Sequence, residues 1–215
     1  MSPILYSFRR CPYAMRARLA LTSAQIRVEL REILLRDKAP EFLAISPSAT
    51  VPCLQVGDLI VDESLDIMIW ALSQADPEGL LDMPDVGYDL IKVFDGPFKT
   101  GLDRYKYHTR YQGAVREDER AAAAAYLWES DARLNGQAWL FGDRPMLTDL
   151  AVLPFVRQFA FTDKAWFDAQ NWGHVHAWLE AFLISDRFGQ IMTKYPKWVL
   201  GDAPEYFGNP LSTAE

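Results

Sequence analysis

The chain changes character near residue 80. Up to Ala75, short apolar runs alternate with short helical stretches, whereas beyond Val86 strand patterns are scarce and long helical patterns follow. The segment between them, "DPEGLLDMPD", is rich in Pro, Gly and Asp and has no clear period, as is typical of linkers. We therefore expect an α/β domain over residues 1–76, a linker over 77–86 and an all-α domain over 87–215.

The first part is predicted to follow the order βαβαββα. Strands are expected at Ile4–Phe8, Ile26–Leu34, Val51–Val56 and Leu59–Val61, the last two forming a hairpin around Gly57-Asp58. Helices are expected at Pro12–Ser23, Ala39–Ile45 and Glu63–Ala75.

The second part is predicted to be helical. The expected helices are Tyr88–Tyr111 with a break at Gly96-Pro97, Arg116–Leu134, Leu147–Phe161, Val175–Ile184 and Asp186–Tyr195. The Ala121–Ala125 run permits close helix contacts, and the polar tail Gly201–Glu215 is expected to wrap the surface.

Composition excludes several classes of function. The net charge of −7 argues against a nucleic-acid binder, whose affinity depends on clustered Lys and Arg. No apolar run reaches the roughly 18 residues needed to cross a bilayer, and the N-terminus lacks the blocks of a secretory signal. Two cysteines cannot form a disulfide framework. We expect a soluble cytoplasmic protein that binds neither nucleic acid nor membrane.

The stretch "FRRCPYAMRARLAL" places Cys11 at the start of a helix. Pro12 takes the favoured first helical position, so Cys11 becomes the N-cap, where the helix dipole favours a thiolate. Residues 1–40 carry eight basic and three acidic side chains, a net charge of +5, which favours the thiolate further. Ala14 stands where a C-x-x-C motif has its second thiol, so any chemistry is monothiol. The alternatives are a buried structural cysteine and arginines that are merely solvated.

Three stretches resemble the cytosolic glutathione transferases, and the resemblance extends over nearly the whole chain. "YSFRRCPYAMRARLAL" is similar to the nucleophile region of the cysteine-type members, especially the omega class, with Cys11 at the catalytic position. "SPSATVPCL" resembles the Pro-x-x-x-Val-Pro-x-Leu segment, and "DESLDI" resembles the Glu-Ser helix start. The resemblance implies a thioredoxin-like first domain, a helical second domain and a bacterial member of the cysteine type.

The resemblance also assigns roles to residues. The Val51 backbone would pair with the cysteinyl unit of glutathione beside a cis Pro52, and Lys38 would contact the glycyl carboxylate. Glu63 and Ser64 would hold the γ-glutamyl end, which agrees with the preference of helix N-termini for carboxylates. The implied glutathione-binding residues are Tyr13, Lys38, Val51, Pro52, Glu63 and Ser64.

Other candidate residues lie outside these motifs. Tyr107, His108 and Tyr111 are expected on the first long helix, lining a second-substrate pocket that faces Cys11. We expect no metal, since His174 and His176 are two residues apart and share no helix face.

Two further expectations concern packing. Cys53 reads as a core residue, with a redox partnership with Cys11 left open. "LFGDRPMLTDLAVLPF" resembles the family's buried capping segment, in which Asp149 supports its helix, although Met146 replaces the usual Ser or Thr.

The sequence thus predicts a glutathione-dependent thiol transferase or reductase in which Cys11 forms a mixed disulfide with glutathione. Glutathione is the co-substrate, the other partner is a small disulfide or electrophile, and the family expectation is a homodimer. One alternative is conjugation of glutathione to electrophiles with Ser7 or Tyr6 in place of Cys11. The other is a non-catalytic module of the same fold that binds proteins.

Overall fold

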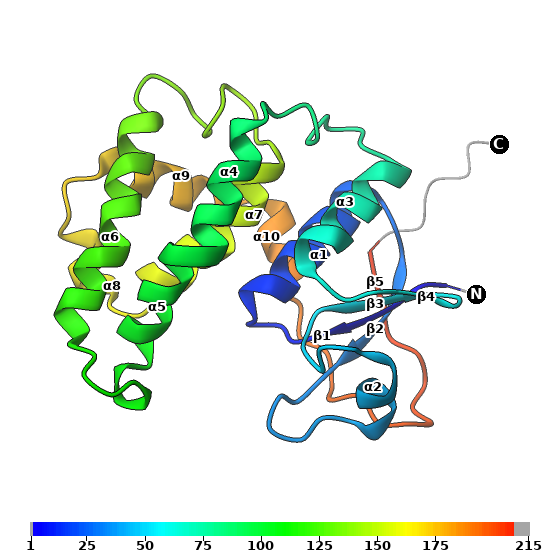
Figure 1. Cartoon of the computed structure of the whole chain (residues 1–215). Coiled ribbons are helices and arrows are strands. Elements are labelled where there is room, and N and C mark those ends of the chain that lie inside the picture. The colour runs from blue at the N-terminus through cyan, green and yellow to red at the C-terminus, as the bar shows by residue number, and fades with distance from the viewer. Residues whose placement is uncertain (1, 209–215) are drawn as a thin grey trace. The chain divides into compact units, whose positions relative to one another are not determined.

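The computed structural model describes residues 2–208. The described residues up to Leu81 and those from Ser185 onward form one compact unit, and Asp82–Ile184 form another. Figure 1 traces both units along the chain by colour. The expected mixed α/β domain followed by a helical domain is confirmed.

A five-stranded sheet forms the centre of the first unit, in the order β4-β3-β1-β2-β5. β1 runs parallel to β2, and the other neighbours are antiparallel. The register places Tyr6 of β1 between Arg31 of β2 and Cys53 of β3. The strands are β1 (Ile4–Ser7), β2 (Val28–Glu32), β3 (Cys53–Val56), β4 (Leu59–Val61) and β5 (Tyr206–Phe207).

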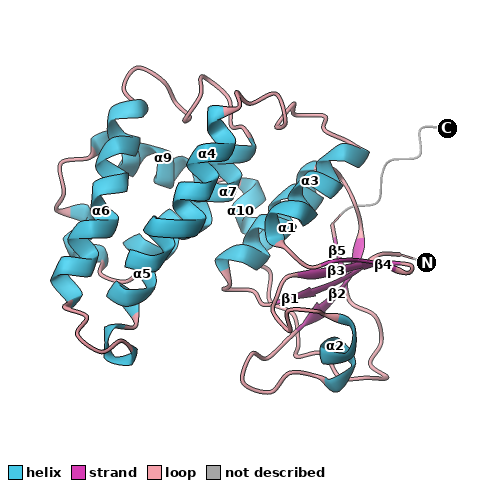
Figure 2. Cartoon of the chain, viewed as in Figure 1, coloured by secondary structure: helices cyan, strands magenta, loops and turns pink. Residues whose placement is uncertain are grey.

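Helices cover both faces of this sheet (Figure 2). α1 (Pro12–Ser23) and α3 (Ser64–Gln74) pack together on one face, and α2 (Pro40–Ile45) lies on the other. α10 (Asp186–Ile191) contacts α1. Because α1 is enclosed by these elements, even Arg16 and Arg18 on it are fully buried.

The described residues after Ile184 pack on the first unit. β5 pairs with the open edge of β2, where unpaired backbone groups favour a further strand. Trp198 joins the core cluster around Tyr6, and the Arg31 guanidinium lies 4.4 Å from its ring centroid. A helical domain was expected over 87–215, whereas the described residues after Ile184 group with the first unit. They do so because β5 pairs with β2 and Trp198 packs in the core cluster of the sheet. Residues 209–215 of the polar tail, which was expected to wrap the surface, lie outside the described residues.

The second unit is built from helices. They are α4 (Val86–Val93), a π-helical turn (Phe94–Phe98), α5 (Lys99–Lys106), a 3₁₀ turn (His108–Arg110), α6 (Arg116–Arg133), α7 (Leu147–Ala160), α8 (Lys164–Asp168) and α9 (Gly173–Leu183). The α-helix is interrupted at the expected place, Gly96-Pro97, but by a π-helical turn rather than by the end of the helical path. Because Pro97 has no N–H to donate, the hydrogen-bond pattern widens there and the helical path continues from α4 into α5.

α5 and α6 approach each other closely at Gly101. A Cβ atom at this position would lie 3.2 Å from the Ala123 Cβ, so both residues must be small. The expected close contact of the Ala121–Ala125 run is therefore confirmed. Within residues 2–208, no helix is both long and apolar enough to span a bilayer.

Candidate functional site

Cys11 is the N-cap of α1. Its backbone is extended (φ −72°, ψ 124°), Pro12 begins the helix, and the first turn of α1 contains no acidic side chain. The half-buried Cys11 thiol donates to the Val51 carbonyl oxygen at 3.7 Å, and the backbone N–H of Cys11 donates to the Phe8 carbonyl at 3.0 Å. The thiol thus lies at the positive end of a helix with no carboxylate in that turn, a setting that favours a thiolate.

The segment before β3 brings two predicted residues to one place. The Val51-Pro52 peptide bond is cis. The Lys38 ammonium donates to the Ala49 carbonyl at 2.9 Å, two residues before the carbonyl that accepts from Cys11. Lys38 and Cys11 therefore both bind the stretch Ala49–Val51, although they come from different parts of the sequence.

Ser64 is the first residue of α3, and Glu63 is its N-cap. The buried Arg16 guanidinium donates to the Ser64 hydroxyl at 3.5 Å and lies 5.7 Å from the Tyr13 ring centroid. Glu63 is exposed, and its side chain makes no capping bond. A ligand carboxylate at this position would meet the α3 N-terminus, a hydroxyl and a buried cation together.

Asp62 is a supporting residue that the sequence reasoning missed. Its carboxylate accepts from the Ser46 hydroxyl and the Ser48 N–H, both at 2.8 Å. Burial opposes ionisation, but these hydrogen bonds outweigh it and lower the pKa of Asp62. The residue ties the loop before Val51 to the start of α3, and its spacing from the serines gave no signal of this.

Arg18 is a second missed residue, and it lies beneath the loop before Cys11. Its Nη2 donates to the Arg9 carbonyl at 2.6 Å, and Glu32 accepts from the Arg9 N–H at 2.7 Å. Burial lowers the pKa of Arg18 to about 10, against the charges of Glu32 and Cys11, and burial also raises the pKa of Glu32. The seven-residue spacing from Cys11, two helical turns, is the signal that could have found it.

The competing nucleophiles are enclosed. Burial, followed by the charge of Asp62, raises the pKa of Cys53 to about 12, which agrees with its expected packing role. Tyr6 and Ser7 are 2% and 0% exposed, and the Tyr6 hydroxyl accepts from Arg31 at 2.7 Å. Burial also raises the pKa of Tyr6, despite Arg31. None of the three presents a reactive group at the surface.

Comparison with known proteins identifies the chain's family. A family model described as "Glutathione S-transferase, N-terminal domain" matches residues 5–79, and one described as "Glutathione S-transferase, C-terminal domain" matches residues 113–181. The chain belongs to the glutathione S-transferase superfamily.

Solved structures show the same fold. A glutathione transferase family member from Pseudomonas fluorescens, solved with two glutathione bound, is 19% identical, with a TM-score of 0.76 over 89% of this chain and 92% of that one. Poplar glutathione transferase F1 is 16% identical, with a TM-score of 0.75 over 89% and 97%. Glutathione transferase Omega 2C from Trametes versicolor is 17% identical, with a TM-score of 0.69 over 88% and 92%.

The helical unit of this transferase carries the candidate second-substrate residues. They do not lie on the first long helix, because α5 ends at Lys106 and His108 begins a 3₁₀ turn. The Arg110 guanidinium lies 4.4 Å from the Tyr107 ring centroid, and Tyr111 is exposed. Their role in substrate binding stays a prediction.

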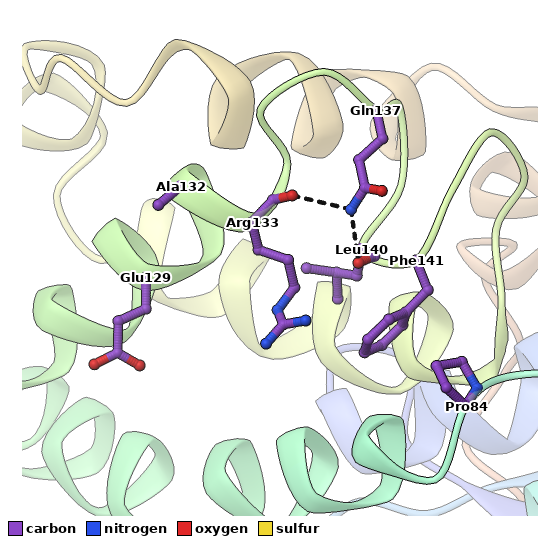
Figure 3. A pocket seen from close by; sticks show the side chains of 7 residues that line it. All are labelled: Pro84, Glu129, Ala132, Arg133, Gln137, Leu140 and Phe141. Atoms are coloured by element: carbon purple, nitrogen blue, oxygen red, sulfur yellow. Dashed lines mark hydrogen bonds between the residues drawn. The ribbon is translucent and has the colours of Figure 1, made fainter.

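A depression of about 700 Å³ lies elsewhere in the helical unit (Figure 3). The side-chain amide of Gln137, one of the lining residues, donates to the Arg133 and Leu140 carbonyls at 2.9 and 2.8 Å. Its lining contains none of the predicted site residues: it comprises Pro84, Glu129, Ala132, Arg133, Gln137, Leu140 and Phe141. Across residues 2–208, no group of three or more His, Cys, Asp or Glu side chains is arranged to hold a metal ion.

Asp149 organises the start of α7. Its carboxylate accepts from the Met146 N–H at 2.9 Å and from the Leu140 N–H and the Trp178 indole N–H, both at 3.0 Å. Burial raises the pKa of Asp149 to about 6, although these hydrogen bonds oppose the shift. The expected supporting role is confirmed.

Proposed function

We propose that the protein is a glutathione-dependent thiol transferase or reductase of the omega-like cysteine type, with Cys11 as its nucleophile. The observation that carries the proposal is the half-buried Cys11 thiol at the N-terminus of α1, 3.7 Å from the Val51 carbonyl beside the cis Pro52. The helix N-terminus stabilises a thiolate, which is the attacking species in disulfide exchange. A cytoplasmic homodimer from a bacterium belongs to the same proposal.

Glutathione would occupy the groups around Cys11. Its cysteinyl backbone would pair with Val51, and its glycyl carboxylate would meet Lys38 in place of the Ala49 carbonyl. Its γ-glutamyl carboxylate would lie at Ser64, where Arg16 adds positive charge, and Glu63 would take the ammonium group. Tyr13 completes the proposed set. A structure of the same fold from Pseudomonas fluorescens was solved with two glutathione bound.

The chemistry is two successive thiol–disulfide exchanges. The Cys11 thiolate attacks the glutathione sulfur of a mixed disulfide, so that a Cys11–glutathione disulfide forms and the substrate leaves as a thiolate that takes up a proton. A second glutathione, as its thiolate, then attacks the glutathione sulfur of that adduct. Oxidised glutathione leaves, and Cys11 returns to the thiolate. The net reaction converts one mixed disulfide and one glutathione into the free thiol of the substrate and one oxidised glutathione.

The conjugating alternative with Ser7 or Tyr6 fits the structure less well. Activation of a glutathione thiol requires a hydroxyl that reaches it, whereas both hydroxyls are enclosed and Tyr6 is bound by Arg31. Cys11 is the half-buried group at a helix N-terminus. We therefore retain exchange at Cys11 as the proposed reaction.

The proposal is tested by turnover on the mixed disulfide of glutathione and 2-mercaptoethanol. Cys11→Ala is expected to lose turnover, and Cys53→Ala, a matched cysteine outside the site, is expected to keep it. Turnover by Cys11→Ala near the wild-type rate would overturn the proposal. Conjugation of an aryl halide by that variant would favour the alternative.

A further inference from the structure

The peptide of Arg9, two residues before Cys11, is held from both sides. Glu32 on β2 accepts its N–H at 2.7 Å, and Arg18 on α1 donates to its carbonyl at 2.6 Å. Arg18 reaches the loop because it lies two turns after Cys11 on the same helix face, and long helical side chains lean toward the N-terminus. The loop that presents the nucleophile therefore rests on a buried guanidinium.

The charge of Arg18 is only partly balanced. The side chain is fully buried, and its Nε and Nη1 have no hydrogen-bond partner; Oε2 of Glu32 is likewise buried without one. The carboxylate of Glu32 is directed to the Arg9 N–H through Oε1, so it does not form a contact ion pair with the guanidinium. A buried charge without a close counter-ion is costly, and a further negative charge nearby would lower that cost.

The charges of four ionisable groups act on Arg18. They are Glu32 on β2, Cys11 and Arg9 in the loop, and Tyr195 in the segment after α10. The Tyr195 hydroxyl donates to the Tyr206 carbonyl at 3.2 Å, and burial raises its pKa, so it stays neutral. Cys11 is thus the group in this set whose ionisation adds a negative charge to that of Glu32.

We propose that Arg18 is a positioning residue for Cys11: it fixes the loop through the Arg9 carbonyl and supplies the buried positive charge that the Cys11 thiolate balances. The inference rests on the proposed function for its purpose, namely that a thiolate is needed for exchange. The effect of Arg18 on Cys11 can be measured without glutathione, because it changes the reactivity of the Cys11 thiol itself. Glu32 opposes the thiolate while it holds the same loop.

The test is the alkylation of Cys11 by iodoacetamide, followed by intact mass from pH 5 to 9. All variants carry Cys53→Ala, so that one thiol remains. Arg18→Met removes the charge and is expected to slow alkylation at pH 7 by about tenfold and move the pH profile upward. Arg18→Lys keeps a cation and is expected to recover at least half of the lost rate. Glu32→Gln removes the opposing charge and is expected to move the profile to lower pH.

A folded Arg18→Met protein with the unchanged pH profile would overturn the proposal, as would an Arg18→Lys protein that behaves like Arg18→Met. If Arg18→Met does not fold, as judged by circular dichroism, Glu32→Gln decides, and its unchanged profile would contradict the inference. Failure of the proposed function is distinguishable, since it would appear as Arg18-dependent alkylation without any glutathione adduct. If the glutathione adduct forms at the same rate in wild type and Arg18→Met, the inference about Arg18 is wrong and the proposed function stands.

Discussion

The Cys11 thiol donates to the carbonyl oxygen of Val51 at 3.7 Å, across forty residues of sequence. This contact joins the start of α1 to the stretch that leads into β3 through the cis Pro52. Lys38 binds the same stretch at Ala49. Two separate segments of the first unit thus meet at the Cys11 thiol, and Lys38 comes from a third segment that binds two residues away from this contact.

Cys53 should resist thiol reagents in the folded protein. Burial raises the pKa of its thiol to about 12, so that the thiolate is scarce through pH 9. Iodoacetamide should therefore add one label to the native chain and two in denaturant, counted by intact mass. Two labels on the native chain at pH 8 would mean that Cys53 is accessible and that its packing role is wrong.

Ser64→Ala should weaken glutathione binding more than it slows the chemical step. The variant loses a hydroxyl that lies at the α3 N-terminus next to Arg16. Loss of one hydrogen bond to a carboxylate predicts a roughly tenfold increase in KM for glutathione, with kcat nearly unchanged. Ser73→Ala, on the exposed side of the same helix, is the control. Equal KM values for the two variants would place the γ-glutamyl group elsewhere.

Lys38→Met should have a smaller effect, because its ammonium is partly exposed and solvent screens its charge. We expect KM for glutathione to rise by about two- to fivefold, and the increase to shrink at high salt. Lys194→Met, an exposed lysine of the same unit, should leave KM unchanged. A salt-independent effect would indicate that Lys38 acts through the Ala49 carbonyl rather than on the ligand.

Asp149→Ala should destabilise the protein. Three donors, the N–H groups of Leu140 and Met146 and the Trp178 indole, would lose their acceptor in a fully buried place. The expected loss is about 2–4 kcal/mol of unfolding free energy, measured by denaturant titration. Asp143→Ala, exposed on the preceding loop, should change it little. A loss below about 0.5 kcal/mol would contradict the capping role.

Local signals were enough to predict much of the first unit. Pro12 marks the start of α1, which the structure has at Pro12–Ser23 as expected. Gly57-Asp58 marks the hairpin, and Gly57 has the positive φ (60°) that such a turn requires. Cys11 and Ser64 were found from motifs that mark helix starts, and the structure has them at the N-termini of α1 and α3.

The features that were missed depend on contacts between distant residues. β5 forms because Tyr206 and Phe207 find the open edge of β2, and two residues carry too weak a strand pattern to be noticed. The link between Arg18 and the Arg9 carbonyl needs the loop to fold back over α1. Asp62 likewise acts through serines that precede it by fourteen and sixteen residues.

The most direct measurement of the central claim is intact mass after incubation with oxidised glutathione, for wild type, Cys11→Ala and Cys53→Ala. The account predicts one glutathione adduct on wild type and Cys53→Ala, none on Cys11→Ala, and complete removal by reduced glutathione. An adduct that persists on Cys11→Ala, or its absence from the wild type, would contradict exchange at Cys11.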